Sequence, residues 1–256
     1  MTEPAARIER GVLYITLPGT PLDSVLATAL HRLLPEPDDL SAASVVLLDA
    51  PPHGEFAGLG AAAADGELPS GLRDGGPNGV VARCIEALAS LESITVASLS
   101  GDARGCGAEL ALACDLRVAA RTARLGFPHV ACGRVPAGGA TQRLPRLVGP
   151  GPAFRALVLG EEIDGDEMVR LGLAVRATPT AQAAAEEAKT LAGRLGEQSP
   201  TALRACKEAI NAGVDLTLRD GLRLEADLAV LLQTTHDRAE GLRAFLEKRP
   251  PRFSGE

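Results

Sequence analysis

Residues 98–120 read SLSGDARGCGAELALACDLRVAA, which predicts a strand, a glycine-rich turn and the start of a helix in close succession. The first amide N–H groups of a helix have no acceptor within it, so the turn at Gly105 and Gly107 can bind negative charge. Two ligands suit such a turn: a phosphate group, or a thioester oxygen that becomes an enolate. The glycine spacing matches neither GxGxxG nor the Gly-Lys-Ser/Thr of a nucleotide loop. A tight turn that merely requires glycine is the alternative.

Strand and helix patterns alternate on both sides of this stretch. Short apolar runs predict strands at residues 12–17, 44–49, 94–99 and 115–120. Apolar residues at helical spacing predict helices at residues 22–34, 80–91 and from Gly105 to Ala113. This order predicts an α/β fold with a parallel sheet and right-handed crossovers.

The pattern changes after Pro152, where helices follow one another without strong strands between them. They are expected at residues 153–159, 165–171, 181–195, 200–212, 218–232 and 237–247. We therefore expect an α/β core over residues 1–195 and a C-terminal helical region over residues 196–256. That region would support oligomerisation or close over the site.

Composition excludes several classes of partner. A net charge of -7, a single Tyr and no Trp argue against a nucleic-acid surface, so a small-molecule ligand is expected. Five cysteines without metal-ligand spacing fit neither a zinc site nor a disulfide framework, which favours a reducing cytoplasm. No apolar run of about 18 residues occurs and the first residues contain no apolar signal region, so neither membrane insertion nor secretion is expected.

The glycine-rich stretch resembles the crotonase (enoyl-CoA hydratase/isomerase) superfamily, which carries the pattern GxxxGGGxExAxxCDxxxA there. The similarity continues in LGFP at 125–128, GRVPAGGATQRL at 133–144, SPTAL at 199–203 and EGLRAFLEKR at 240–249. It implies a crotonase-like spiral of ββα units with C-terminal helices, assembled as a homotrimer or a hexamer of two trimers. It also implies an acyl-CoA thioester substrate and no separate cofactor, because coenzyme A is part of the substrate.

The resemblance further implies an oxyanion hole made of two backbone N–H groups. One corresponds to Cys106, where the family usually has glycine, and the other to Leu59 in the loop at residues 55–60. The aspartate that usually follows in that loop is missing. A cysteine at a helix N-terminus can also have a lowered pKa and react as a thiolate, which is a second possible role for Cys106.

Hydratases of this family carry two glutamates twenty positions apart. Glu109 matches the first, but the second position (109 + 20 = 129) is occupied by His129. A Glu109 and His129 pair could share proton transfer in the hydration of a 2-enoyl-CoA to a 3-hydroxyacyl-CoA. The alternatives are isomerisation, decarboxylation or thioester hydrolysis with Glu109 alone, and an acyl-CoA binder without catalysis. Glu109 could also be an exposed carboxylate that merely stabilises its helix.

Overall fold

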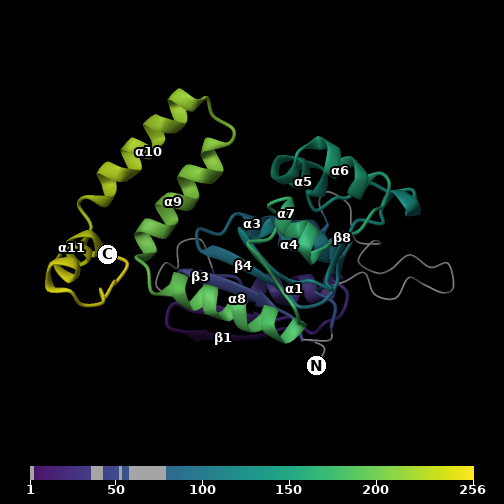
Figure 1. Ribbon diagram of the computed structural model, residues 1–256, viewed down its shortest axis with the longest axis horizontal. Coiled ribbons are helices and arrows are strands. Elements are labelled where there is room, and N and C mark those ends of the chain that lie inside the picture. The colour runs from purple at the N-terminus through teal and green to yellow at the C-terminus, as the bar shows by residue number, and fades with distance from the viewer. Residues whose placement is uncertain (1–2, 36–42, 52–53, 58–78) are drawn as a thin grey trace.

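A six-stranded sheet forms the centre of the molecule (Figure 1). The structure is a computed structural model and describes residues 3–35, 43–51, 54–57 and 79–256. The strands run in the order β1-β2-β3-β4-β6-β9, and β1 alone pairs with its neighbour in the antiparallel sense. Their bounds are β1 Ala5–Glu9, β2 Val12–Thr16, β3 Val45–Asp49, β4 Ile94–Leu99, β6 Leu116–Ala120 and β9 Arg176–Thr178.

Helices cover both faces of this sheet, which explains why β3 is a continuous apolar run with every residue buried. Helix α8 (Ala181–Gly196) packs across one face, against β3, β4 and β6. On the other face, α1 (Ser24–Leu33) contacts α3 (Val80–Ala89), and α3 contacts α4 (Cys106–Ala113). From β2 to β6, each new parallel strand lies on the same side of the one before it. Right-handed crossovers in such an order place the connecting helices on one face of the sheet.

A second, three-stranded sheet connects the glycine-rich turn to the middle of the chain. It contains β5 (Ala103–Arg104), β7 (Arg124–Gly126) and β8 (Ile163–Asp164). The 3-10 helix η1 (Val130–Cys132) and helices α5 (Ala140–Val148) and α6 (Pro150–Leu157) follow β7 along the chain and precede β8, and α7 (Gly165–Arg170) contacts β8.

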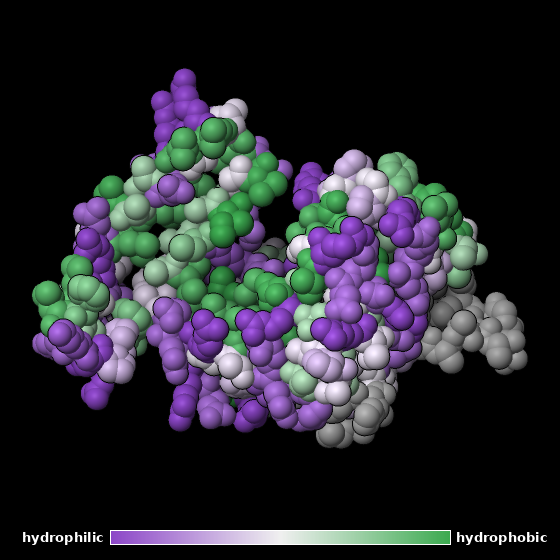
Figure 2. All heavy atoms as spheres, in the orientation of Figure 1, coloured by the Kyte–Doolittle hydropathy of each residue, from purple (hydrophilic) through white to green (hydrophobic). Residues whose placement is uncertain are grey.

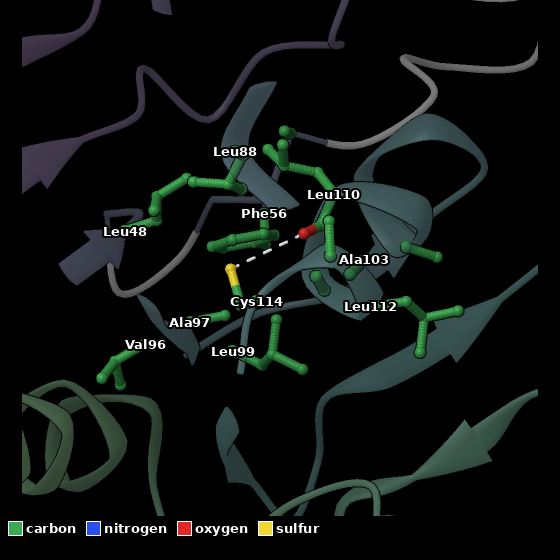
Figure 3. Close-up of a cluster of buried hydrophobic side chains, with 14 of the residues drawn as sticks. Leu48, Phe56, Leu88, Val96, Ala97, Leu99, Ala103, Leu110, Leu112 and Cys114 are labelled. Atoms are coloured by element: carbon green, nitrogen blue, oxygen red, sulfur yellow. Dashed lines mark hydrogen bonds between the residues drawn. The ribbon is translucent and has the colours of Figure 1, made fainter. Parts of the chain in front are cut away.

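Helix α4 is enclosed on all sides by the core. All eight of its residues are buried, and its sequence, CGAELALA, contains one charged residue. Figure 3 shows apolar side chains packed around it, including Phe56, Leu88 and Leu99, and the bond from Cys114 Sγ to the carbonyl oxygen of Leu110. A helix that is apolar all round belongs in a core, so its single carboxylate must be partnered there.

The C-terminal helices extend away from the sheet as an arm (Figure 1). They are α9 (Pro200–Gly213), which packs against α10 (Leu218–Leu232), and α11 (His236–Glu247). Each of α8 to α11 begins after a hydroxyl residue that accepts a bond from a backbone N–H of the first turn, as expected of N-caps: Thr180, Ser199, Thr217 and Thr235. Buried Lys207 of α9 connects the arm to the core. Its Nζ donates a hydrogen bond of 2.7 Å to Asp115 Oδ2 and one of 2.8 Å to the carbonyl oxygen of Ser93.

The predicted α/β order is confirmed, but five strands (β1, β5, β7, β8 and β9) and two helical elements (η1 and α5) of the described residues were not predicted. Strand β1 is fully exposed at the sheet edge and carries little apolar pattern, and β5, β8 and β9 are two or three residues long. Helix α5 has the sequence ATQRLPRLV, in which Pro145 and few apolar residues weaken the helical period. Within the described part of the chain, no helix is long and apolar enough to cross a membrane.

Candidate active site

Glu109 is the single charged side chain of α4 and is 1% exposed, which excludes the role of an exposed helix carboxylate. Its Oε1 accepts two hydrogen bonds, one of 2.7 Å from the N–H of Gly138 and one of 3.2 Å from the N–H of Ala140. Ala140 is the first residue of α5, where N–H groups have no acceptor within the helix and the helix dipole favours negative charge, and Gly138 lies just before the N-cap Gly139. One carboxylate oxygen is therefore fixed, and the orientation of Oε2 is fixed with it.

Burial sets the protonation behaviour of Glu109. Desolvation raises the pKa of its carboxyl, whereas the bonds from Ala140 and Gly138 and the charge of Arg143 lower it. Desolvation is the largest of these effects, so the net pKa is raised. A carboxylate with a raised pKa is a stronger base, which suits it to take a proton near neutral pH.

His129 lies between β7 and η1 and is brought to Glu109 by the tertiary structure. Its Nε2 is 3.7 Å from Glu109 Oε2, too far for a direct hydrogen bond but close enough for one water to contact both. The imidazole is 2% exposed, and its Nδ1 has no hydrogen-bond partner among the described residues. Burial, followed by the charge of Arg134, lowers its pKa to about 4, so the imidazole is neutral at pH 7.

The glycine-rich turn packs against the segment at Phe56 and Ala57, which comes earlier in the chain. Phe56 N–H donates 2.7 Å to the carbonyl oxygen of Asp102. A Cβ on Gly107 would lie 2.3 Å from the carbonyl oxygens of both Phe56 and Ala57, so only glycine permits this approach. The predicted oxyanion donor Leu59 lies outside the described residues.

Cys106 begins α4, after Gly105 with a φ of 55°, so its amide belongs to the helix end as predicted. Its thiol behaves differently from the thiolate hypothesis. Burial, reinforced by the charge of Glu109, raises the pKa of the Cys106 thiol to about 12. The thiolate alternative is wrong for this buried thiol, because desolvation outweighs the effect of the helix N-terminus.

Three supporting groups were not predicted: the amides of Gly138 and Ala140, and the guanidinium of Arg143. Arg143 Nη1 donates a hydrogen bond of 2.6 Å to the carbonyl oxygen of Gly138, and its Nη2 donates one of 2.9 Å to Glu86 Oε2. The sequence signal for this turn was the Gly138–Gly139 pair, because glycine readily adopts a positive φ. In the structure Gly139 has a φ of 100° and is the N-cap of α5. The identity of the acceptor, Glu109, is decided by the packing of α4 on α5.

The chain is similar to known proteins over most of its length. The profile described as Enoyl-CoA hydratase/isomerase matches residues 8–256. The chain is 41% identical over 175 residues to methylglutaconyl-CoA hydratase of Mus musculus, covering 67% of this chain and 56% of the relative. It is 42% identical over 173 residues to crotonyl-CoA hydratase of Syntrophomonas wolfei, covering 68% of this chain and 65% of the relative. The matched stretch thus spans somewhat more than half of each relative.

The likeness in three dimensions extends over the whole chain. The crystal structure of enoyl-CoA hydratase from Bacillus anthracis superposes with a TM-score of 0.87 at 31% identity. The superposition covers 99% of both chains, including the C-terminal helices.

Proposed function

Because this chain belongs to the enoyl-CoA hydratase/isomerase family, we propose that it adds water to a 2-enoyl-CoA ester to give the 3-hydroxyacyl-CoA, or catalyses the reverse reaction. The observation that carries the proposal is buried Glu109, with Oε1 held by two backbone amides and Oε2 directed to His129. The relatives named for crotonyl-CoA and methylglutaconyl-CoA hydration support an enoyl thioester as substrate. Coenzyme A comes with the substrate, so the proposed reaction needs no separate cofactor.

In the proposed mechanism, Glu109 carries the proton. Its carboxylate removes a proton from water as the water oxygen bonds to Cβ, and the electron pair of the Cα–Cβ double bond moves onto the thioester oxygen. The N–H groups of Cys106 and Leu59 stabilise this enolate oxygen. Protonated Glu109 then delivers the proton to Cα as the enolate collapses to the thioester. Water is added across the double bond with no net change at the enzyme.

His129 orients the water in this scheme. A histidine with a pKa of about 4 carries no extra proton at pH 7, so it cannot serve as the acid that protonates Cα. Its neutral ring can instead hydrogen-bond a water that lies between Nε2 and Glu109 Oε2, which are 3.7 Å apart. The lowered pKa of His129 therefore favours Glu109 as the proton carrier and His129 as a positioning residue over proton transfer shared by the two side chains.

The test is Glu109→Gln, with crotonyl-CoA as substrate. Glutamine keeps an oxygen for the two backbone amides but cannot take a proton, so kcat/KM should fall by about 10³-fold. Affinity for the CoA ester should persist, and the melting temperature should not fall, because the variant removes a buried charge whose pKa is raised. Exposed Glu208 on α9 gives the matched control, Glu208→Gln, which should be fully active. Near-normal turnover of Glu109→Gln contradicts the mechanism.

His129 in place of a second carboxylate also favours another enolate reaction on the same site, such as isomerisation, decarboxylation or thioester hydrolysis. Product analysis separates the candidates. Formation of 3-hydroxybutyryl-CoA from crotonyl-CoA supports hydration, whereas tight binding without that product supports the second candidate. Binding of a broad set of acyl-CoA esters without turnover of any identifies a non-catalytic binder.

We also propose that the chain assembles with copies of itself, as a trimer or a pair of trimers. Figure 2 shows apolar side chains gathered along α9 and α10, beside a hollow between this arm and the α5–α6 region. Several are more than half exposed in the single chain: Ile210, Val214, Leu218, Leu222, Val230 and Leu231. Isolated domains rarely expose so many large apolar side chains on one surface. The mass in solution, measured by light scattering, tests the proposal.

A cytoplasmic location is proposed on the chemistry of the cysteines. All five lie in described segments and none forms a disulfide. Burial raises the pKa of Cys84 and Cys114 to about 12, which keeps these thiols protonated inside the core. Such a chain suits a reducing compartment.

A further inference from the structure

The turn that holds Glu109 Oε1 is built around two glycines, which leave it few conformational restraints of its own. A Cβ on Gly138 would lie 2.6 Å from Ile85 Cδ1 and 2.9 Å from Glu109 Cδ, so the carboxylate approaches this closely only because residue 138 has no side chain. Gly139 has a φ of 100°, which other residues rarely adopt. The N–H donors of Gly138 and Ala140 therefore need a contact from outside the turn to hold them in place.

Arg143 makes such a contact. Its Nη1 donates a hydrogen bond of 2.6 Å to the carbonyl oxygen of Gly138, which lies in the chain between the two N–H groups that bind Glu109. A Cβ on Gly139 would overlap the same guanidinium nitrogen, so the guanidinium packs directly against the turn. The side chain of Arg143 is 24% exposed, and this partial burial limits the screening of its charge.

Glu86 of α3 binds the other arm of the guanidinium. Its Oε2 accepts a hydrogen bond of 2.9 Å from Arg143 Nη2. The side chain of Glu86 is 70% exposed, so this ion pair contributes little to stability and serves mainly to orient the guanidinium. A planar guanidinium bound through two of its nitrogens has a fixed orientation. The ion pair thereby connects α3 to the turn that holds Glu109.

The charge of Arg143 also acts on Glu109. Burial raises the pKa of the Glu109 carboxyl, and the positive charge of Arg143 is one of the effects that lower it. The other titratable or charged groups on the described segments around Glu109 are Arg83, Cys84 and Glu86 on α3, Arg104 on β5, Cys106 on α4, His129 and Arg134 beside η1, and Arg146 on α5. Burial raises the pKa of both thiols to about 12 and lowers that of the imidazole to about 4, so these three groups are neutral at pH 7. Loss of the Arg143 charge should therefore raise the pKa of Glu109 further.

We propose that Arg143 is a positioning residue: through the carbonyl of Gly138 it fixes the turn that holds Glu109 Oε1, and its charge keeps the carboxylate ionised to take a proton from water. The inference rests on the hydratase function proposed above. Position matters because a displacement of about 1 Å in a catalytic site costs on the order of 100-fold in rate. Ionisation matters because a protonated carboxyl cannot accept the proton. Both effects act on the chemical step rather than on affinity for the CoA ester.

Arg143→Gln, with crotonyl-CoA as substrate, tests the inference. kcat should fall by about tenfold while KM stays within about twofold of the wild-type value. The acidic limb of the pH profile of kcat/KM should move to higher pH, because Glu109 without the nearby cation becomes protonated where the wild type is still ionised. Arg143→Lys keeps the charge but not the fork, so the limb should return towards its wild-type position while kcat recovers only in part. Exposed Arg146 on α5 gives the matched control, Arg146→Gln, which should change neither kcat nor the limb.

A measurement without turnover separates this inference from the hydratase proposal. Infrared difference spectroscopy follows the C=O stretching band of protonated Glu109 against pH, and loss of the band in Glu109→Gln assigns it. The midpoint should lie at higher pH in Arg143→Gln than in the wild type. If the midpoint moves but crotonyl-CoA gives no 3-hydroxy product, the hydratase proposal fails and the role of Arg143 stands.

Glu86→Ala removes only the outer hydrogen bond, at an exposed position, and it decides the matter if Arg143→Gln does not fold. Its kcat should fall by about threefold at unchanged KM, because the guanidinium loses the partner that orients it. Three outcomes overturn the inference: an unmoved acidic limb and infrared midpoint in folded Arg143→Gln, a loss in that variant confined to KM, or a wild-type kcat in Glu86→Ala.

Discussion

Gly107→Ala tests whether the close approach of α4 to the preceding loop sets the geometry of the site. The added Cβ would lie 2.3 Å from the carbonyl oxygens of Phe56 and Ala57 and 2.7 Å from the carbonyl carbon of Ala57. An ordinary contact begins at 3.4 Å, so the two segments must separate by 3.4 − 2.3 = 1.1 Å. The obstructing atoms are backbone, and a change of rotamer cannot relieve the clash. The helix end bearing the Cys106 amide moves relative to the loop as a result.

A displacement of about 1 Å in a site that depends on fixed donors costs on the order of 100-fold in rate. We therefore expect Gly107→Ala to lower kcat for crotonyl-CoA hydration by about 100-fold and to destabilise the fold by about 1–3 kcal/mol, as overpacking does. Steady-state kinetics and urea unfolding measure the two effects. Gly193→Ala in α8 is the control, because its Cβ would meet nothing within 4 Å, and it should keep full activity. Wild-type kcat with an unchanged urea midpoint in Gly107→Ala would refute the reasoning.

Three further predictions concern stability and reactivity. Lys207→Met should destabilise the fold by about 3 kcal/mol in urea unfolding, because it leaves Asp115 without its cation, and a loss below about 1 kcal/mol would contradict this. Since the pKa of His129 falls from 6.5 to about 4 on folding, the unfolded chain takes up the proton first as the pH drops. Stability should therefore decline between pH 6.5 and 4 by roughly 3 kcal/mol, and His129→Gln should abolish that part of the decline in urea titrations at both pH values. Iodoacetamide at pH 7.5 should label two exposed cysteines and spare the three buried ones, and mass spectrometry should locate the label at Cys132 and Cys206.

Much of the fold could be predicted because the information is local. Apolar runs such as Ile94–Leu99 and helical periods such as Leu218–Leu232 are written in a few consecutive residues, and both were predicted with those bounds. The short strands β5 and β8 could not be, since two residues have no period and pair only because the chain brings them together. Helix α5, whose first residue supplies one of the two amides for Glu109, was missed for a related reason: its stability comes from packing on α4 and α6 rather than from its own pattern.

The amino-acid sequence by itself determined the glycine-rich turn, the family and the positions of Glu109 and His129, because residue types and spacings are properties of the chain. Only the tertiary structure decided the pKa values, and so the protonation states, of the side chains in the site. Enclosure of α4 raised the pKa of Glu109, burial held His129 neutral, and the same desolvation kept the Cys106 thiol protonated where helix position suggested a thiolate. It also placed Glu86 of α3 within 2.9 Å of Arg143 of α5. Solvent exclusion and the convergence of distant segments are decided by packing, and no local pattern encodes them.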